Sequence, residues 1–219
     1  MRGTIENAPF GTTLTLVLEP QESVSVTPGA MIAMSGVSLK ETSASSKLKM
    51  MKGQFRNVFQ SGSHGGWICL AASTPGDIVE MPMGHGAKLN IKAGQVLAHT
   101  TNVSSSSVVD TKGIFSNGGM LMKQYKADGH ASLWVAAFGS VKPITMDHSQ
   151  AMVVDNTNLL AYDHSVSYDM VKVGGGFRSS MFGGEGLACS FTGKGTVYVQ
   201  SHSTAEFAAC LAPYMRQPN

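Results

Sequence analysis

One short pattern occurs three times along this chain of 219 residues. In each occurrence a turn is followed by two apolar residues, an alanine and a large residue. The alanines of the three copies, Ala33, Ala98 and Ala161, lie 65 and 63 positions apart. Self-similarity at a nearly fixed period is the signature of a repeat architecture. The three copies occupy residues 28–34, 93–99 and 156–162.

Apolar residues alternate with polar ones before and after each copy, which places them on one face of a pleated strand. Gly, Ser, Asn and Asp separate these segments at short intervals, as they do in sandwiches and barrels. The sequence therefore predicts roughly fifteen to twenty short strands. The clearest alternations are Leu14/Leu16/Leu18, Val24/Val26, Leu89/Ile91, Leu133/Val135/Ala137, Val166/Tyr168/Met170 and Val197/Val199.

The last part of the second copy also matches the last part of the third copy. Residues 129–135 align with residues 193–199, and we expect the first copy to lose this hairpin at Thr74-Pro75-Gly76. A unit of about 64 residues buries little surface alone, so the units are expected to pack into one body. We predict a single all-β domain over 1–219, of three sandwich-like repeats around a pseudo-threefold axis. Their bounds are about 12–75, 76–138 and 139–202.

A helix is expected only at 203–212. Ser203 and Glu206 form a capping box, in which each side chain satisfies a free backbone donor. Phe207 and Leu211 share one face at a spacing of four residues, and Pro213 ends the helix.

Composition narrows the class of protein. Only 14% of the residues are charged and 25 are glycine, which excludes a helical bundle. The net charge of +2 makes neither nucleic acid nor a membrane an expected partner. The first residues have no apolar signal core, so we expect a cytoplasmic location, with the mitochondrion as the alternative.

The segment from Lys172 to Gln200 reads KVGGGFRSSMFGGEGLACSFTGKGTVYVQ. It resembles the C-terminal signature of the altered-inheritance-of-mitochondria family, the mitochondrial biogenesis proteins and their bacterial relatives. Pro28-Gly29-Ala30-Met31 and the segment 75–79 resemble that family too. The second copy departs from it, because Ser116-Asn117-Gly118-Gly119-Met120 stands where the family keeps a Phe-Gly-Gly-Glu-Gly motif.

The resemblance implies a fold like that of the tryptophan RNA-binding attenuation protein. Such a fold consists of short double-stranded β-helix units, often assembled into rings or trimers. The resemblance implies no known reaction, no catalytic residues and no cofactor.

The glycine clusters at 174–176 and 183–186 are the first candidates for a site. A phosphate-binding loop needs a helix after it, whereas strand-like segments flank both clusters. Tight turns or close packing at a subunit contact are the favoured interpretation. Arg178, between the clusters, is the candidate anion ligand, with an interface or surface ion pair as the favoured alternative.

The seven histidines and three cysteines show no metal-ligand spacing, so no metal site is expected. Asp147-His148 and Asp163-His164 are neighbours in sequence, but neighbours on a strand point to opposite faces and form no triad. The basic stretch from Lys40 to Arg56 is either an arm that meets acidic lipid or RNA, or a solvated insertion, which we favour.

We therefore expect a non-enzymatic, β-rich homo-oligomer, of which a trimer is the first candidate, that scaffolds or binds partners. The first alternative is a small-molecule or RNA-binding module that uses a groove between repeats. The second alternative is a metal-dependent enzyme of the cupin type.

Overall fold

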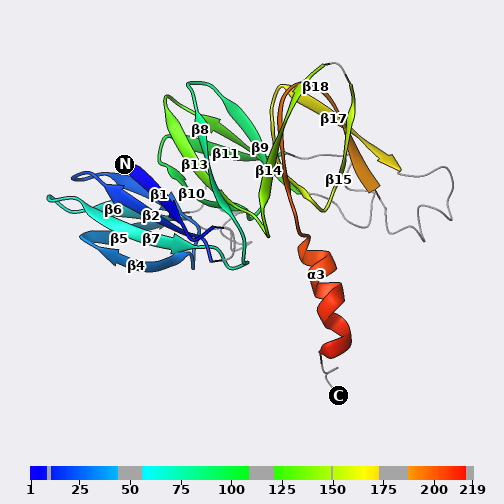
Figure 1. The fold of residues 1–219 in the computed structure, drawn as a ribbon. Helices are drawn as coiled ribbons and strands as arrows, with labels where there is room; N and C mark the ends of the chain where they lie inside the picture. The colour runs from blue at the N-terminus through cyan, green and yellow to red at the C-terminus, as the bar shows by residue number, and fades with distance from the viewer. Residues whose placement is uncertain (9–10, 44–55, 109–120, 149, 173–186, 216–219) are drawn as a thin grey trace. The chain divides into compact units, whose positions relative to one another are not determined.

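The computed structural model describes residues 1–8, 11–43, 56–108, 121–148, 150–172 and 187–215 (Figure 1). This part of the chain is all-β except for the helix α3 (Thr204–Leu211) and the short 3-10 turn η1 (Ala212–Tyr214). The predicted fold class is thus confirmed. None of the described helices has the length and apolar character needed to span a membrane.

The chain divides into two compact units. The first unit comprises Met1–Lys88, Gly94–Ser105 and Tyr125–Ala137, and the second comprises Leu89–Ala93, Ser106–Gln124 and Phe138–Asn219. The predicted single domain of three repeats stays a prediction.

The first unit contains a four-stranded antiparallel sheet in which β4 and β1 form the two edges. Alternation along β2 points Leu14, Leu16 and Leu18 into the core, where all three are buried, as predicted. The sheet order is β1 (Arg2–Glu6), β2 (Thr13–Leu18), β7 (Gly66–Ala71) and β4 (Met31–Ser35).

A six-stranded sheet packs against the four-stranded one. Val24 and Trp134 of this second sheet belong to one buried cluster with Leu16 and Ile68 of the first, so the two sheets form a sandwich. The order is β5 (Val37–Ser43), β6 (Arg56–Ser61), β3 (Ser23–Val26), β10 (Val96–Thr100), β13 (Ala131–Ala136) and β8 (Ile78–Met83).

The second unit has its own core, which includes Phe191, Leu159 and Met122. Its central strand, β18, pairs with β15 and β17 through its first half and with β14 and β16 through its second half. β18 spans Leu187–Gln200, and its partners are β14 (Val141–Asp147), β15 (Met152–Asp155), β16 (Leu159–Asp163) and β17 (Val166–Lys172). Three further strands, β9 (Lys88–Lys92), β11 (Val103–Val108) and β12 (Met122–Ala127), contain residues of both units.

The same irregularity recurs at the three aligned alanines. β4 pairs with β7, β10 with β13 and β16 with β18, and in each pair the register shifts just before the alanine. A bulge of this kind adds one residue to one strand and bends it. Three copies of one unit would produce this recurrence.

The expected loss of a hairpin in the first copy is wrong. β6 and β7 follow one another there, with Gly62 and Gly65 paired in the turn between them. The strands of this pair lie in different sheets, so the chain crosses between sheets at the glycines instead of folding back within one sheet. In the third copy the single continuous strand β18 makes the corresponding crossing. It pairs with β17 up to Gly193 and with β14 beyond it, and these two pairings belong to different sheets.

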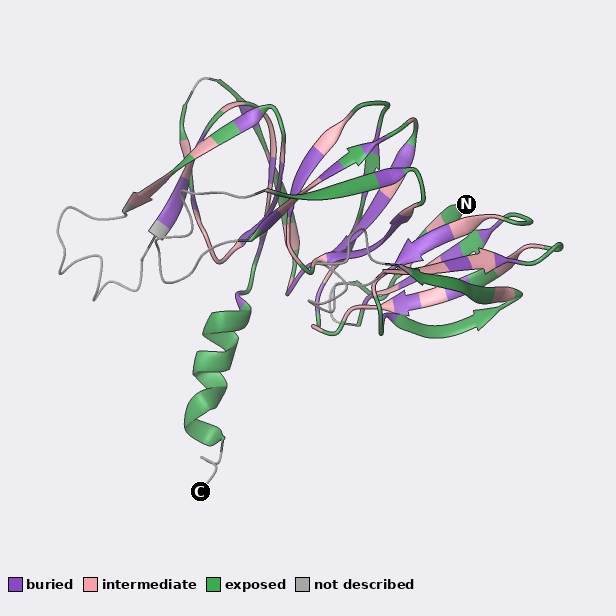
Figure 2. Cartoon of the chain, turned by 180° about the vertical axis from the view of Figure 1, so that it is seen from behind, coloured by how far each residue is buried: buried purple, intermediate pink, exposed green. Residues whose placement is uncertain are grey.

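Helix α3 begins where the sequence predicts. The hydroxyl of Ser203 accepts a hydrogen bond from the backbone N–H of Glu206 at 3.4 Å, so Ser203 is the N-cap. No residue of α3 is buried, and Figure 2 shows the helix exposed along its length. The apolar side chains of α3 are therefore not buried in the core of the described chain.

Candidate functional site

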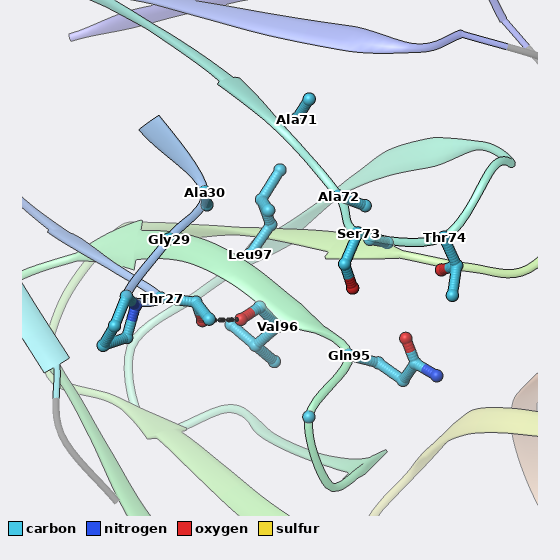
Figure 3. Close-up of a pocket in the computed structure, with 13 residues that line it drawn as sticks. Thr27, Gly29, Ala30, Ala71, Ala72, Ser73, Thr74, Gln95, Val96 and Leu97 are labelled. Carbon is cyan, nitrogen blue, oxygen red and sulfur yellow. Dashed lines mark hydrogen bonds between the residues drawn. The ribbon is translucent and has the colours of Figure 1, made fainter. Parts of the chain in front are cut away.

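A cavity of about 200 Å³ opens in the first unit, at the end of the sandwich where β3 and β7 finish (Figure 3). We call it the Thr27 cavity. Three short segments line most of it: the turn after β3, the end of β7 with the residues that follow, and the residues around the start of β10. These segments are 27–30, 71–74 and 94–97.

The Thr27 cavity is apolar on one side and polar on the other. Ala30 and Leu97 contribute methyl groups, whereas the side chains of Ser73, Thr74 and Gln95 lie together on the opposite side (Figure 3). Among the described residues none of these three polar side chains has a hydrogen-bond partner. They are therefore free to bind a ligand.

Thr27 connects the cavity to a buried polar cluster. Its hydroxyl donates to the carbonyl oxygen of Val96 at 2.6 Å and accepts a hydrogen bond from Nη1 of Arg56 at 2.7 Å. The position of Arg56 follows from the pairing of β3 with β6. Val26 lies opposite Asn57 in this pairing, so the next residue of each strand places Arg56 beside Thr27. The guanidinium is thus one hydrogen bond away from the cavity wall.

Arg56 is partly buried, and its guanidinium interacts electrostatically with the phenol of Tyr125. Burial lowers the pKa of Arg56, an effect that Tyr125 partly opposes. Burial likewise raises the pKa of the Tyr125 phenol, and the neighbouring guanidinium moderates that rise. A guanidinium stays charged in proteins, so this corner of the sheet carries a fixed positive charge.

His99 completes the cluster as a neutral group. Its Nδ1 lies 2.8 Å from the carbonyl oxygen of Thr100, which only accepts, so we assign the ring proton to Nδ1. Burial, followed by the charge of Arg56, lowers the pKa of His99 to about 4. At neutral pH the cluster therefore contains one cation, Arg56, and two neutral rings.

A second hollow, of about 540 Å³, lies beside His85 and Asp128. The side chains of this pair are 79% and 91% exposed, and Nδ1 of His85 is 3.7 Å from Oδ1 of Asp128. That nitrogen accepts a hydrogen bond from the backbone N–H of Gly129 at 3.1 Å. An exposed pair of this kind contributes little energy, so we place no site there.

Asp163 and His164, which are neighbours in the sequence, contact different groups. Oδ2 of Asp163 accepts from the backbone N–H of Thr196 at 2.7 Å, whereas Nδ1 of His164 lies 3.2 Å from Nε2 of Gln124. The two side chains therefore have different partners. In the described part of the chain no three His, Cys, Asp or Glu side chains lie together as a metal site would require.

Several residues singled out from the sequence lie outside the described residues. They are Arg178, the glycine clusters at 174–176 and 183–186, and most of the basic stretch after Lys40. Arg56, the last residue of that stretch, belongs to the polar cluster beneath the Thr27 cavity instead. Sequence reasoning missed this cluster, because its members come from four separate strands and turns and match no local motif.

The described chain is thus a β-sandwich protein whose strands cross between sheets, with one short C-terminal helix. It belongs to the family described as Mitochondrial biogenesis AIM24, whose model matches residues 4–202. The resemblance seen in the sequence is confirmed.

Two bacterial proteins illustrate this relationship. An uncharacterized protein of Streptococcus pyogenes serotype M6 is 32% identical over 168 residues, which are 76% of this chain and 66% of that protein. The chain thus spans slightly less than two thirds of that relative. A crystal structure of another Streptococcus pyogenes protein matches with a TM-score of 0.78 and 27% identity, covering 98% of this chain and 99% of the other.

Proposed function

We propose that the protein is a non-enzymatic scaffold that works by self-association, with a trimer as the expected assembly. The observation that carries this proposal is helix α3, an apolar helix in which no residue is buried. Natural chains bury apolar helices against another surface, because apolar area in contact with water is costly.

The composition of α3 explains why it needs a partner. Glu206 is its one charged residue, and Phe207 and Leu211 are 48% and 41% exposed. Tyr214 and Met215, just beyond the helix, are also exposed. Phe207 touches Phe138 with ring centroids 5.2 Å apart, which anchors the start of the helix and leaves the rest uncovered.

Strand β4 supplies a second surface of the same kind, in the first unit. It is an edge strand, all five of its residues are exposed, and it contains Met31, Ile32 and Met34. Native proteins protect an exposed edge with charged residues, proline or a covering segment. β4 has neither a charge nor a proline, which favours a second chain as its cover.

Two different apolar surfaces on one chain favour a heterologous contact, in which one surface of a copy meets the other surface of the next. Such contacts close into rings when the rotation allows it. A trimer is the smallest ring of this type.

Charge substitutions on each surface test the proposal by sedimentation velocity of the full chain at micromolar concentration. Phe207→Asp with Leu211→Asp on α3, and Ile32→Lys on β4, are expected to shift the wild-type oligomer toward monomer. Val153→Lys is the matched control, because Val153 is an equally exposed apolar residue on β15. Variants that sediment like this control would contradict the proposal.

A further inference from the structure

The outward side of the four-stranded sheet carries an exposed apolar pair. Leu16 of β2 and Ile68 of β7 point into the core. Because side chains alternate along a strand, their neighbours Val17 and Trp67 point outward. Val17 lies directly opposite Trp67 in the pairing of the two strands, and they are 39% and 40% exposed. Contiguous apolar side chains in contact with water mark interaction surfaces.

Cys69 lies on the same side of the sheet. It follows Trp67 by two residues on β7, and its Sγ accepts a hydrogen bond from the hydroxyl of Thr15 at 3.7 Å. Ala33 of the edge strand β4 lies opposite Cys69. We call the surface formed by Val17, Trp67 and Cys69 the outer sheet face, and it continues directly into the exposed strand β4.

Helix α3 presents an apolar stripe of its own. Phe207, Cys210 and Leu211 share one side of the helix, since they are spaced by three and four residues, and all three are exposed. Glu206, one turn before Cys210, borders this stripe and is the one charged residue of the helix. The stripe is therefore apolar with a single negative charge near its start.

The outer sheet face has a positive charge at its border. Arg2 of β1 is exposed and lies opposite Val17. Within the described part of the chain neither Arg2 nor Glu206 forms a salt bridge. Glu6, the other charged residue of β1, is about 13 Å further along the strand, beyond the screening length of physiological salt. The charges of the two surfaces are therefore complementary.

We propose that α3 of one copy packs across the outer sheet face of the next copy, with Glu206 beside Arg2 and Cys210 above Cys69. This inference rests on the proposed self-association and names the two surfaces that meet in it. The apolar stripe of α3 covers Val17 and Trp67, which neither surface achieves alone.

The dimensions of the two surfaces agree. The 8 residues of α3 are about 12 Å long, and four strands spaced by about 4.8 Å form a sheet about 14 Å wide. Arg2 and Cys69 are two strands apart, about 10 Å. Glu206 and Cys210 are one helical turn apart, about 6 Å, and the long arginine and glutamate side chains span the difference.

Cross-linking of the native thiols in the full chain tests this arrangement. A short bismaleimide joins thiols that lie close together, and the remaining cysteine, Cys189, is fully buried. We expect a Cys69–Cys210 link between two chains, seen as dimer and trimer bands on a denaturing gel and identified by peptide mass spectrometry. A Cys69–Cys210 link within one chain, or a link between two copies of Cys210, would overturn the proposal.

Two single variants identify the reacting thiols. Cys69→Ser and Cys210→Ser each remove one of them, so neither variant should cross-link alone. A co-incubated mixture of the two variants should give a cross-linked dimer, because each chain supplies the thiol that the other lacks. A mixture without this dimer would also contradict the arrangement.

Charge reversal gives a readout that needs no thiol. Arg2→Glu and Glu206→Arg are each expected to raise the concentration at which the oligomer dissociates about threefold, and the double variant to restore the wild-type value. Lys142→Glu, which reverses an exposed charge on β14, is the matched control and should change nothing. A double variant no better than the single ones would count against the contact between Arg2 and Glu206.

The results also separate this inference from the proposed function. An oligomer in light scattering that shows neither the Cys69–Cys210 link nor the charge coupling leaves self-association in place and overturns the packing of α3 on the sheet. A chain that is monomeric at every concentration overturns both.

Discussion

The phenol ring of Tyr125 meets the imidazole of His99 edge to face, with centroids 6.3 Å apart and planes inclined at 64°. Both side chains are almost fully buried, on strands far apart in the sequence. The contact keeps His99 away from water and next to Arg56. A histidine in this position is held neutral, which gives the fold a defined dependence on pH.

We predict that the protein loses stability as the pH falls from about 6.5 to about 4. The pKa of His99 is about 4 in the folded state and 6.5 in an unfolded chain, so between these values the unfolded chain binds the proton and the folded chain does not. Stability therefore rises with pH across this window. Between pH 7.5 and pH 4.5 the loss amounts to about 2.5 kcal/mol, to be measured by urea unfolding at both pH values.

His99→Gln is expected to flatten this dependence, because the glutamine has no proton to bind. His130→Gln replaces an exposed histidine of the same unit and should keep the wild-type slope. Identical slopes for His99→Gln and wild type would refute the assignment.

The crossing from β6 to β7 requires glycine at position 66. A Cβ there would lie 2.6 Å from the backbone carbonyl of Gly36. Backbone atoms cannot rotate away as the end of a side chain can, so the clash would force the strands to shift. We expect Gly66→Ala to cost about 1–3 kcal/mol of unfolding free energy, as overpacking does. Gly84→Ala has open space and should fall within ~0.5 kcal/mol of wild type in the same denaturant titration.

The core of the second unit depends on three aromatic rings. Phe191 contacts Tyr162 and Tyr168 at centroid distances of 5.4 Å each, and it is fully buried. Phe191→Ala is expected to destabilise the protein by about 3–5 kcal/mol. Thr192→Ala, the next residue on the exposed face of β18, is the control, and equal losses for both would contradict this description of the core.

The N-cap of α3 links helix stability to assembly. Ser203→Ala removes the acceptor for the N–H of Glu206 and should cost about 1 kcal/mol of helix stability. If α3 carries the subunit contact, the same substitution raises the concentration at which oligomers dissociate. Thr204→Ala, which removes the hydroxyl of an exposed residue of the helix, is the comparison, with dissociation followed by dilution and light scattering.

The sequence was sufficient to predict the strands. Alternation identified Leu14, Leu16 and Leu18 as a buried row, and the capping motif located Ser203, because both signals depend on residues close together in the chain. Alternation alone says which residues share a face but not which sheet a strand joins. For that reason the sequence predicts the loss of the last hairpin in the first copy, whereas the structure has β6 and β7 there, joined by a crossing between sheets.

The polar cluster could not be predicted in this way. Arg56, Tyr125 and His99 meet only because β6 and β10 flank β3 in one sheet and β12 brings its tyrosine to the same histidine. In the sequence Arg56 reads as the end of a basic stretch and His99 as a residue near a turn. Long-range pairing of strands, which no local pattern encodes, turns them into neighbours.

The molar mass of the full chain in solution tests the central claim most directly. Multi-angle light scattering across a range of micromolar concentrations should give about three times the 23.0 kDa of one chain, falling toward one chain on dilution or with Phe207→Asp and Leu211→Asp. A mass of one chain at every concentration would contradict the proposal that this protein works by self-association.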